Sequence, residues 1–316
     1  MYLKFLSFIS VLSVVFIPGF VWAEADGPDF FRVKSSEAPI RVEAHAESSV
    51  VAVFTNGTVG LKNLGCTGVL SYEDWLKLSD DEKKTAKENV WCKVSFLQHK
   101  ETAQVGADLY SGVTGWVQNI LLQEYGVPSG PTFKCEKVTS EVEKLICSDR
   151  DLMFLDHTLN GVYNASLDAV NKLPSQRQQA AKSKLMALQR GWIKGRNDCW
   201  KEQEEIKACV QDSYLHRIVR LQAEWDLTTV DKPATRFTCD GNDRNEFYAT
   251  ELDLILPVVI VERGDSRDIL VKAYAVTEVQ DRLFSGAFGN QLTFFDDTVT
   301  LRWRNETLNC RTASSD

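Results

Sequence analysis

The sequence lacks the short motifs that mark common catalytic sites. It has no GxSxG nucleophile turn, no GxxxxGK phosphate loop, no HExxH zinc motif and no glycine-rich dinucleotide turn. Its 4 histidines are scattered and no two cysteines form a CxxC pair, so the close ligand pairs of a structural zinc site are missing. We therefore expect no catalytic residue, no metal and no cofactor, and a protein that is not an enzyme.

Basic residues are fewer than acidic ones. The chain of 316 residues has 36 Lys and Arg against 44 Asp and Glu, a net charge of −8. A nucleic-acid-binding surface needs clustered Lys and Arg to neutralise phosphates, so this balance argues against a nucleic-acid partner. The 10% of aromatic residues supply apolar surface for a folded core. The length fits two or three domains.

Residues 1–23 have the pattern of a signal peptide. Lys4 gives a positive start, residues 5–21 are largely apolar, and Val21-Trp22-Ala23 suits cleavage after the alanine. The alternative is an uncleaved anchor, but the apolar run is short against the ~20 residues of a membrane-spanning helix. We expect a periplasmic or secreted protein with no membrane span after signal removal. Because no cysteine precedes Cys66, we also expect no lipid at a lipobox cysteine.

The cysteine count is even, which in an exported chain indicates four disulfides. Free, buried cysteines are the alternative. The eight are Cys66, Cys92, Cys135, Cys147, Cys199, Cys209, Cys239 and Cys310. For the middle four we favour local pairing, Cys135 with Cys147 and Cys199 with Cys209, over the two other pairings, which stay open.

Turn-rich linkers at residues 127–131 and 228–234 divide the chain into three parts. We expect a multidomain α+β protein with domains at 24–130, 131–227 and 235–316. Residues 24–130 carry 10 basic and 15 acidic side chains, and residues 235–316 carry 9 and 14, so each has a net charge of −5.

The first part is rich in short β-forming runs. They occur at residues 30–33, 40–42, 50–54, 58–61 and 91–94. Asn56-Gly57 predicts a β-hairpin between two of them. Residues 71–89 break the pattern, and the spacing of Ser79 and Glu82 predicts a capped helical insertion there.

These runs, with the closing Gly115-Trp116-Val117, resemble a bacterial SH3-like domain. The resemblance implies a small β-barrel, of a kind that often binds cell-wall peptides or glycans, so peptidoglycan becomes a possible ligand. We place Trp116 in the core rather than on a binding platform.

The second part is helical. Ser140 and Glu143 form a second capping-box pair, and Leu152 and Leu155 begin an apolar stripe that ends before Pro174. A third helix at about 176–196 has Leu185, Leu188 and Trp192 on one stripe, and a fourth runs from Ile206 to Trp225. Together they predict a small disulfide-linked bundle.

This part resembles the LprI-like lysozyme-inhibitor domain. The matching residues, in order, are Phe133-Lys134-Cys135, residues 142–147, Leu155-Asp156, Leu159, Tyr163, residues 189–192, residues 196–199, Cys209, Tyr214 and Arg217. Membership implies an exported helical domain, with lysozyme inhibition in some relatives. For Asp156, Arg190 and Arg196 we favour hydrogen bonds that tie helices together over contact with a partner.

The third part returns to strands. They are expected at residues 247–250, 258–261, 269–274, 292–295 and 299–303, with hairpin turns at 262–265 and at Asp296-Asp297. The part resembles the MliC-like inhibitors of c-type lysozyme, small antiparallel barrels whose first and last strands are joined by a disulfide. The matching residues are Phe237-Thr238-Cys239, Arg263-Gly264-Asp265, Ser285-Gly286-Ala287, Phe294-Phe295 and Cys310.

The MliC-like resemblance implies where a partner would be contacted. In that family a serine of a Ser-Gly loop and a lysine of a following hairpin enter the lysozyme cleft. Here Ser285, Gly286 and Ala287 match the loop, while Asp296 and Asp297 stand in the position of the lysine. Aspartates would be repelled by catalytic carboxylates, so a plain exposed turn is the favoured interpretation of that pair.

We therefore expect a periplasmic or secreted binding protein related to lysozyme inhibitors, whose partner is a c-type lysozyme or another cationic wall-degrading enzyme. The alternative is a peptidoglycan-binding envelope adaptor without lysozyme inhibition.

Overall fold

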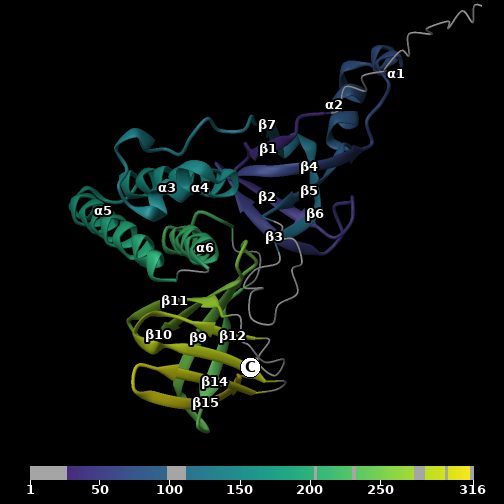
Figure 1. Cartoon of the computed structure of the whole chain (residues 1–316). Coiled ribbons are helices and arrows are strands. Elements are labelled where there is room, and N and C mark those ends of the chain that lie inside the picture. Colours follow the sequence, from purple (N-terminus) through teal and green to yellow (C-terminus); the bar gives the residue numbers. More distant parts are fainter. Residues whose placement is uncertain are drawn as a thin grey trace, which may run out of the picture.

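The computed structural model describes residues 27–97, 112–202, 205–229, 233–273, 282–295 and 298–313. The expected signal peptide at residues 1–23 lies outside these ranges. Figure 1 shows a β-sheet, a group of helices and a β-barrel. The expected mixed α and β class is confirmed. None of the helices in the described ranges combines the length and apolar character that crossing a membrane requires.

The N-terminal part is a seven-stranded antiparallel sheet with the strand order β3-β2-β6-β5-β4-β1-β7. Its strands are β1 Phe30–Val33, β2 Glu37–Arg41, β3 Val50–Thr55, β4 Val59–Thr67, β5 Trp91–Phe96, β6 Val113–Gln118 and β7 Leu122–Glu124. All five expected strands are present. In the described residues the sheet is not closed into a barrel, so the SH3-like identity stays a proposal. The side chain of Trp116 lies on the half-buried side of β6 and not in the core, contrary to our expectation.

The hairpin expected at Asn56-Gly57 is wrong. The chain does turn there, and Gly57 has a φ of 88°. However, β3 pairs with β2, whereas β4 pairs with β1 and β5. The turn donates hydrogen bonds to the β1–β2 connection instead, from the Asn56 N–H to the Ser36 carbonyl and from the Gly57 N–H to the Val33 carbonyl. The dipeptide reverses the chain locally, but non-local burial decides which strands pair.

The helical insertion consists of α1 Tyr72–Lys77 and α2 Asp80–Glu88. The capping box expected at Ser79 and Glu82 is confirmed. The Ser79 N–H donates to Glu82 Oε2 at 2.7 Å, and the Glu82 N–H donates to Ser79 Oγ at 3.4 Å. This reciprocal pair satisfies two backbone donors that the first turn of α2 would otherwise leave free.

The middle part contains α3 Glu141–Ser148, α4 Arg150–Asn171, α5 Ser175–Asn197 and α6 Ile206–Glu224. Two expectations about it are wrong. The Ser140 side chain makes no cap hydrogen bond, and the Glu143 carboxylate, which would complete the box, accepts from Asn197 Nδ2 on α5 instead. Leu188 is 43% exposed although Leu185 is buried, because the covered stripe of α5 runs through Ala181, Leu185 and Trp192, and Leu188 lies at its edge.

The C-terminal part is a closed antiparallel barrel in the order β10-β11-β12-β13-β14-β15-β8-β9. Its strands are β8 Thr235–Cys239, β9 Asn242–Leu252, β10 Val258–Arg263, β11 Ser266–Lys272, β12 Leu283–Ser285, β13 Gln291–Phe295, β14 Thr298–Trp303 and β15 Glu306–Thr312. The hairpin expected at 262–265 is confirmed, since Arg263 pairs with Ser266. Inside, the rings of Phe237 and Phe247 stack with centroids 4.9 Å apart.

All eight cysteines lie in disulfides, so the alternative of free cysteines is excluded. The pairs are Cys66–Cys92, Cys135–Cys147, Cys199–Cys209 and Cys239–Cys310. The middle four pair locally, as favoured above. The last bond joins β8 and β15, the first and last strands of the barrel, and closes it.

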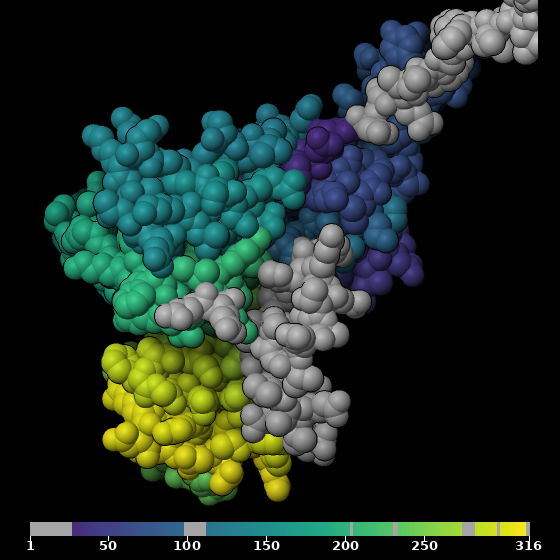
Figure 2. Space-filling view, in the orientation of Figure 1, coloured from purple at the N-terminus to yellow at the C-terminus, as the bar shows by residue number. Residues whose placement is uncertain are grey.

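The three parts share contacts. The face of the sheet, α3–α6 and the outer side of β10 and β11 form one continuous apolar core, while the barrel interior is a separate cluster. Gln222 Nε2 on α6 donates to Thr55 Oγ1 on β3 at 2.8 Å, and Arg267 Nη2 on β11 donates to the Ala223 carbonyl at 3.2 Å. Figure 2 shows the helices lying directly on the barrel.

Candidate functional site

The loop predicted to contact a partner connects β12 to β13. Ser285 ends β12, and the Gly286 N–H donates to the Asn290 carbonyl at 2.8 Å. The Asn290 N–H in turn donates to the Ala287 carbonyl at 2.9 Å. These two bonds close residues 286–290 into a tight loop at one end of the barrel.

Two polar side chains fix this loop to its neighbours. Asp268 Oδ2 on β11 accepts from the Ala287 N–H at 3.0 Å and from Asn290 Nδ2 at 2.8 Å. Asn290 is buried, and its Oδ1 accepts from the Arg304 N–H at 2.6 Å. A Cβ at Gly286 would lie 2.4 Å from Asp268 Oδ2, so the loop approaches β11 as closely as only glycine permits. The loop is therefore rigid before any partner arrives.

Sequence reasoning missed Phe288, which lies between Ala287 and Gly289 in this loop. Its side chain is 90% exposed. The signal available in the sequence was an aromatic residue flanked by small residues in a turn, which carries no periodicity and therefore drew no prediction.

The predicted contact segment at Asp296-Asp297 lies outside the described residues. Its neighbours Phe295 and Thr298 pair with each other at one end of β13 and β14. Ser285 pairs with Gln291 at the other end of β13. The described residues that flank the two predicted segments are thus separated by the length of a strand and do not come together.

A buried polar network crosses the helical part. Asp156 Oδ1 on α4 accepts from the Tyr214 hydroxyl of α6 at 2.8 Å, and its Oδ2 accepts from the N–H and hydroxyl of Thr132, each at 2.6 Å. Arg196 of α5 is only 4% exposed, and its Nη1 donates to the Tyr214 oxygen at 2.9 Å. Three helices and the incoming linker therefore meet at one phenol.

Burial raises the pKa of Tyr214 far above its ordinary value, and the neighbouring Asp156 carboxylate raises it further. The phenol therefore stays protonated and can donate to Asp156 while it accepts from Arg196. Asp156 and Arg196 thus tie the helices together, which is the interpretation favoured above. Arg190 does not: it is exposed and makes no hydrogen bond or ion pair with the residues that the structure describes.

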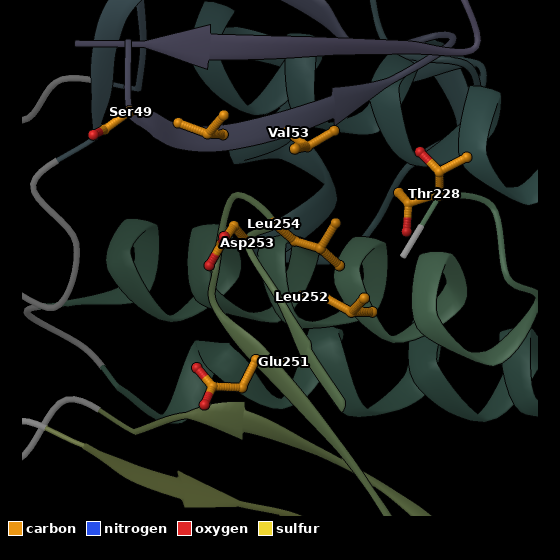
Figure 3. A pocket seen from close by; sticks show the side chains of 9 residues that line it. Ser49, Val53, Thr228, Glu251, Leu252, Asp253 and Leu254 are labelled. Carbon is orange, nitrogen blue, oxygen red and sulfur yellow. The ribbon is translucent and has the colours of Figure 1, made fainter. Parts of the chain in front are cut away.

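Two cavities lie near these features. One of about 230 Å³ opens over the network and is lined by Phe133, Glu143, Tyr163, Trp192 and Arg196 among others. Another of about 370 Å³ lies where β3, the segment after α6 and β9 meet (Figure 3). Glu251 points into this junction cavity, but its carboxylate is already paired with Arg282 Nη2 at 3.0 Å.

His157 has a structural role. His157 bridges α4 and the linker, with Nε2 2.9 Å from the Gly130 carbonyl and Nδ1 3.3 Å from the Tyr125 hydroxyl. No three His, Cys, Asp or Glu side chains of the described residues converge as a metal site. The loop after β12, held by hydrogen bonds, and the helical part, held by hydrogen bonds and disulfides, can present rigid surfaces to another molecule.

Comparisons with known proteins agree with the resemblance drawn for the helical part. The family model described as "Lysozyme inhibitor LprI" matches residues 135–224, which span α3 to α6 and the two local disulfides. This supports an LprI lysozyme-inhibitor domain in that segment. At the level of the family, an inhibitor also agrees with the expectation that the protein is not an enzyme.

Curated relatives cover a somewhat longer segment. Proteins named "Lipoprotein LprI" from Mycobacterium bovis and from two strains of Mycobacterium tuberculosis are 32% identical to the chain over 123 residues. The match covers 38% of this chain and 56% of each relative, so the chain spans about half the length of the curated relatives it matches. No solved structure matches the chain.

Proposed function

We propose that the protein is a periplasmic or secreted binding protein that inhibits lysozyme. The observation that carries this proposal is the match of residues 135–224 to the lysozyme-inhibitor family. The same segment contains the Asp156–Tyr214–Arg196 network and two disulfides. The disulfides cross-link the segment, and the network holds its helices together. The relatives named as lipoproteins favour a location outside the cytoplasm.

An inhibitor of this kind needs no catalytic group. It occupies the surface of the enzyme and excludes the substrate, and a rigid surface loses little conformational entropy when it binds. The net charge of −8 attracts a cationic partner, so association is fast at low ionic strength and slower in salt. The proposed partner is a c-type lysozyme or another cationic wall-degrading enzyme.

Loop insertion is the proposed mode of contact for the barrel. The loop that contains Ser285-Gly286-Ala287 is held by Asp268 and Asn290, and its exposed tip at Phe288 and Gly289 suits entry into a cleft. Asp296 and Asp297 are proposed as a second, acidic contact that meets basic residues around the cleft and not its catalytic carboxylates.

The proposal is tested with the chain from residue 24 onward and a c-type lysozyme acting on bacterial cell walls. We expect slower lysis at micromolar protein, weaker inhibition as salt rises, and a complex detectable by calorimetry. A chain with its four disulfides reduced serves as a control for the need of a rigid surface. Absence of both inhibition and binding at low salt would contradict the proposal.

A specific observation favours one alternative, a peptidoglycan-binding adaptor. In the N-terminal part, Val69 and Tyr72 are more than half exposed and line a cavity of about 270 Å³, and Leu76 of the same insertion is also more than half exposed. Sugars and peptides of the cell wall could stack on such a surface. Retention of the chain on purified peptidoglycan, reduced by the double change Tyr72→Ser and Leu76→Ser, together with no effect on lysozyme, would favour this alternative.

A further inference from the structure

The exposed Phe288 occupies a backbone position that aromatic residues rarely adopt. Its φ and ψ are 54° and 25°, and the next residue, Gly289, has a φ of 74°. With the hydrogen bond from the Asn290 N–H to the Ala287 carbonyl, Phe288-Gly289 form the centre of a type I′ turn. Such turns favour Asn, Asp or Gly at the first central position, because a bulky side chain at positive φ is sterically strained.

Other turns of the same barrel have glycine or a polar residue at this position. Asp240-Gly241 connects β8 to β9 with φ values of 54° and 68°. Gly264 connects β10 to β11 with a φ of 56°, and Arg304 connects β14 to β15 with the same value. In each of these turns the first central residue is glycine or a polar residue that water can solvate. Among these turns, Phe288 alone places an apolar ring at the strained position.

In the isolated protein, no packing contact of the ring offsets the backbone strain at Phe288. With 90% of its surface exposed, the ring packs against almost nothing that could offset the unfavourable backbone or the apolar surface in water. The backbone beneath it is nevertheless fixed, because Asp268 and Asn290 hold both sides of the turn. An exposed aromatic side chain on a fixed backbone is suited to anchor an interface, because aromatic residues are enriched there.

The charge of the surrounding domain indicates what kind of partner would bury this ring. Residues 235–316 carry 9 basic and 14 acidic side chains, so the barrel is acidic. An anionic membrane surface would repel it, and one aromatic residue without basic neighbours is a weak membrane anchor. A cationic protein with an apolar cleft fits both features, since the charge attracts it and the cleft covers the ring.

We propose that Phe288 is the aromatic anchor with which the barrel binds an apolar cleft of a cationic lysozyme. This inference rests on the proposed function, and it names the residue that contributes most to the affinity. The type I′ turn fixes the backbone beneath the ring, so only the two side-chain torsions of Phe288 remain to be ordered when the complex forms. Ser285 and Gly286 then act through the loop geometry and not through an insertion of their own.

The test compares Phe288→Asn with the unchanged chain. Asparagine is preferred at this turn position, so the variant keeps the loop and removes only the ring. We expect the Tm to stay equal or rise, while the Kd for a c-type lysozyme, measured by calorimetry at low salt, rises about 30-fold, as for the loss of a hot spot. Phe288→Tyr, which keeps a ring, should stay within about threefold of the unchanged chain.

Val127→Asn is the matched control, because it removes an exposed apolar side chain of the linker after β7 and should leave the Kd unchanged. If the unchanged chain binds lysozyme and Phe288→Asn binds equally well, the anchor is refuted and the proposed function stands. If the unchanged chain does not bind lysozyme at all, the proposed function fails and the anchor with it. A clear fall in the Tm of Phe288→Asn would show that the ring packs within the protein, which also refutes the anchor.

Discussion

The sheet and the barrel are both antiparallel, and each has one disulfide between neighbouring strands, yet they are built differently. In the barrel every neighbouring pair except β15 and β8 follows in sequence. In the sheet, β2 pairs with β6 and β4 pairs with β1, so distant segments of the chain must meet. The barrel interior is an apolar cluster of its own, whereas the core of the sheet continues into the helices.

This difference shows what each region depends on. The barrel follows from tight turns and alternating burial along consecutive strands, and its disulfide closes the one long-range pair. The sheet depends on what packs against it. Phe30 of β1 lies against Phe154 of α4 with ring centroids 4.9 Å apart, and the Val59 N–H donates to Thr158 Oγ1 at 3.1 Å.

The largest expected effect is the loss of the disulfide that closes the barrel. Cys239 and Cys310 are 71 residues apart, whereas Cys66 and Cys92 are 26 apart. In the chain-entropy model these bonds contribute about 4.4 and about 3.5 kcal/mol to the free energy of unfolding. We expect Cys239→Ser with Cys310→Ser to lower the free energy of unfolding in urea more than Cys66→Ser with Cys92→Ser.

The reverse order would contradict this comparison. It would mean that the long-range pairing of the sheet depends on its disulfide more than the closure of the barrel does. Both double variants are measured without reductant, so that the remaining disulfides stay intact.

The next effect tests the contact between the sheet and the helices. Gly60 has a φ of 83°, and a Cβ there would lie 2.5 Å from Cγ of Phe154 on α4. Gly241 in the barrel has a φ of 68° and open space around it. Alanine at either site meets the strain of positive φ, about 1–2 kcal/mol, but only Gly60→Ala also overpacks a core contact, which adds about 1–3 kcal/mol.

The two alanine variants are therefore compared by their free energies of unfolding. Equal losses would show that Phe154 moves aside without cost and that the sheet depends less on α4 than its packing indicates.

Most strands of both regions could be predicted from the sequence, but the pairing of the sheet could not. Short β-rich runs bounded by turn residues indicated β1, β3 and β14, whereas β7, β8, β12 and β15 were not predicted. Asn56-Gly57 indicated a hairpin because this dipeptide favours a tight turn. A dipeptide does not specify which strands pair on either side of the turn. Which strands pair across the sheet depends on the burial of α4 and α6 against it, and no short segment carries that information.

The candidate site divides in the same way. The resemblance of about residues 133–225 indicated the helical part, and the family match over 135–224 supports it. Phe288 could not be found from the sequence, because a single exposed aromatic residue has no periodicity and a positive φ is not visible in the residue itself. The spacing of Ser140 and Glu143 predicted a capping box, but Glu143 accepts a hydrogen bond from Asn197, 54 residues away, and Ser140 makes no cap bond.

A smaller effect is expected at the phenol that joins the helices beneath the sheet. Tyr214→Phe removes the hydroxyl between Asp156 and Arg196 and leaves both buried groups with one hydrogen bond fewer. An unsatisfied buried polar group costs about 1–3 kcal/mol, and we expect a loss of about 2 kcal/mol in the free energy of unfolding. His216→Phe, on the same helix but at an exposed ion pair, serves as the control and should change stability little. A loss at Tyr214 no larger than at His216 would mean that water replaces the hydroxyl.

The smallest expected effect is on the local stability of α2 in the helical insertion. The sheet has this insertion of two short helices, whereas the barrel strands are joined by tight turns. Hydrogen bonds from the backbone and side chain of Ser79 lower the pKa of Glu82 below its ordinary value of 4.5. A carboxylate whose pKa is lowered in the folded state stabilises that state above its ordinary pKa, and the gain is lost as the pH falls through the lowered value. Amide hydrogen exchange of α2 should therefore accelerate as the pH falls below about 4.5, after correction for the intrinsic pH dependence of exchange. Glu82→Gln keeps the capping box without a titrating group, so its α2 protection should not change over the same pH range. If the glutamine variant loses the same amount of amide-exchange protection in acid, titration of another group destabilises α2. In that case the capping box does not control the stability of this helix.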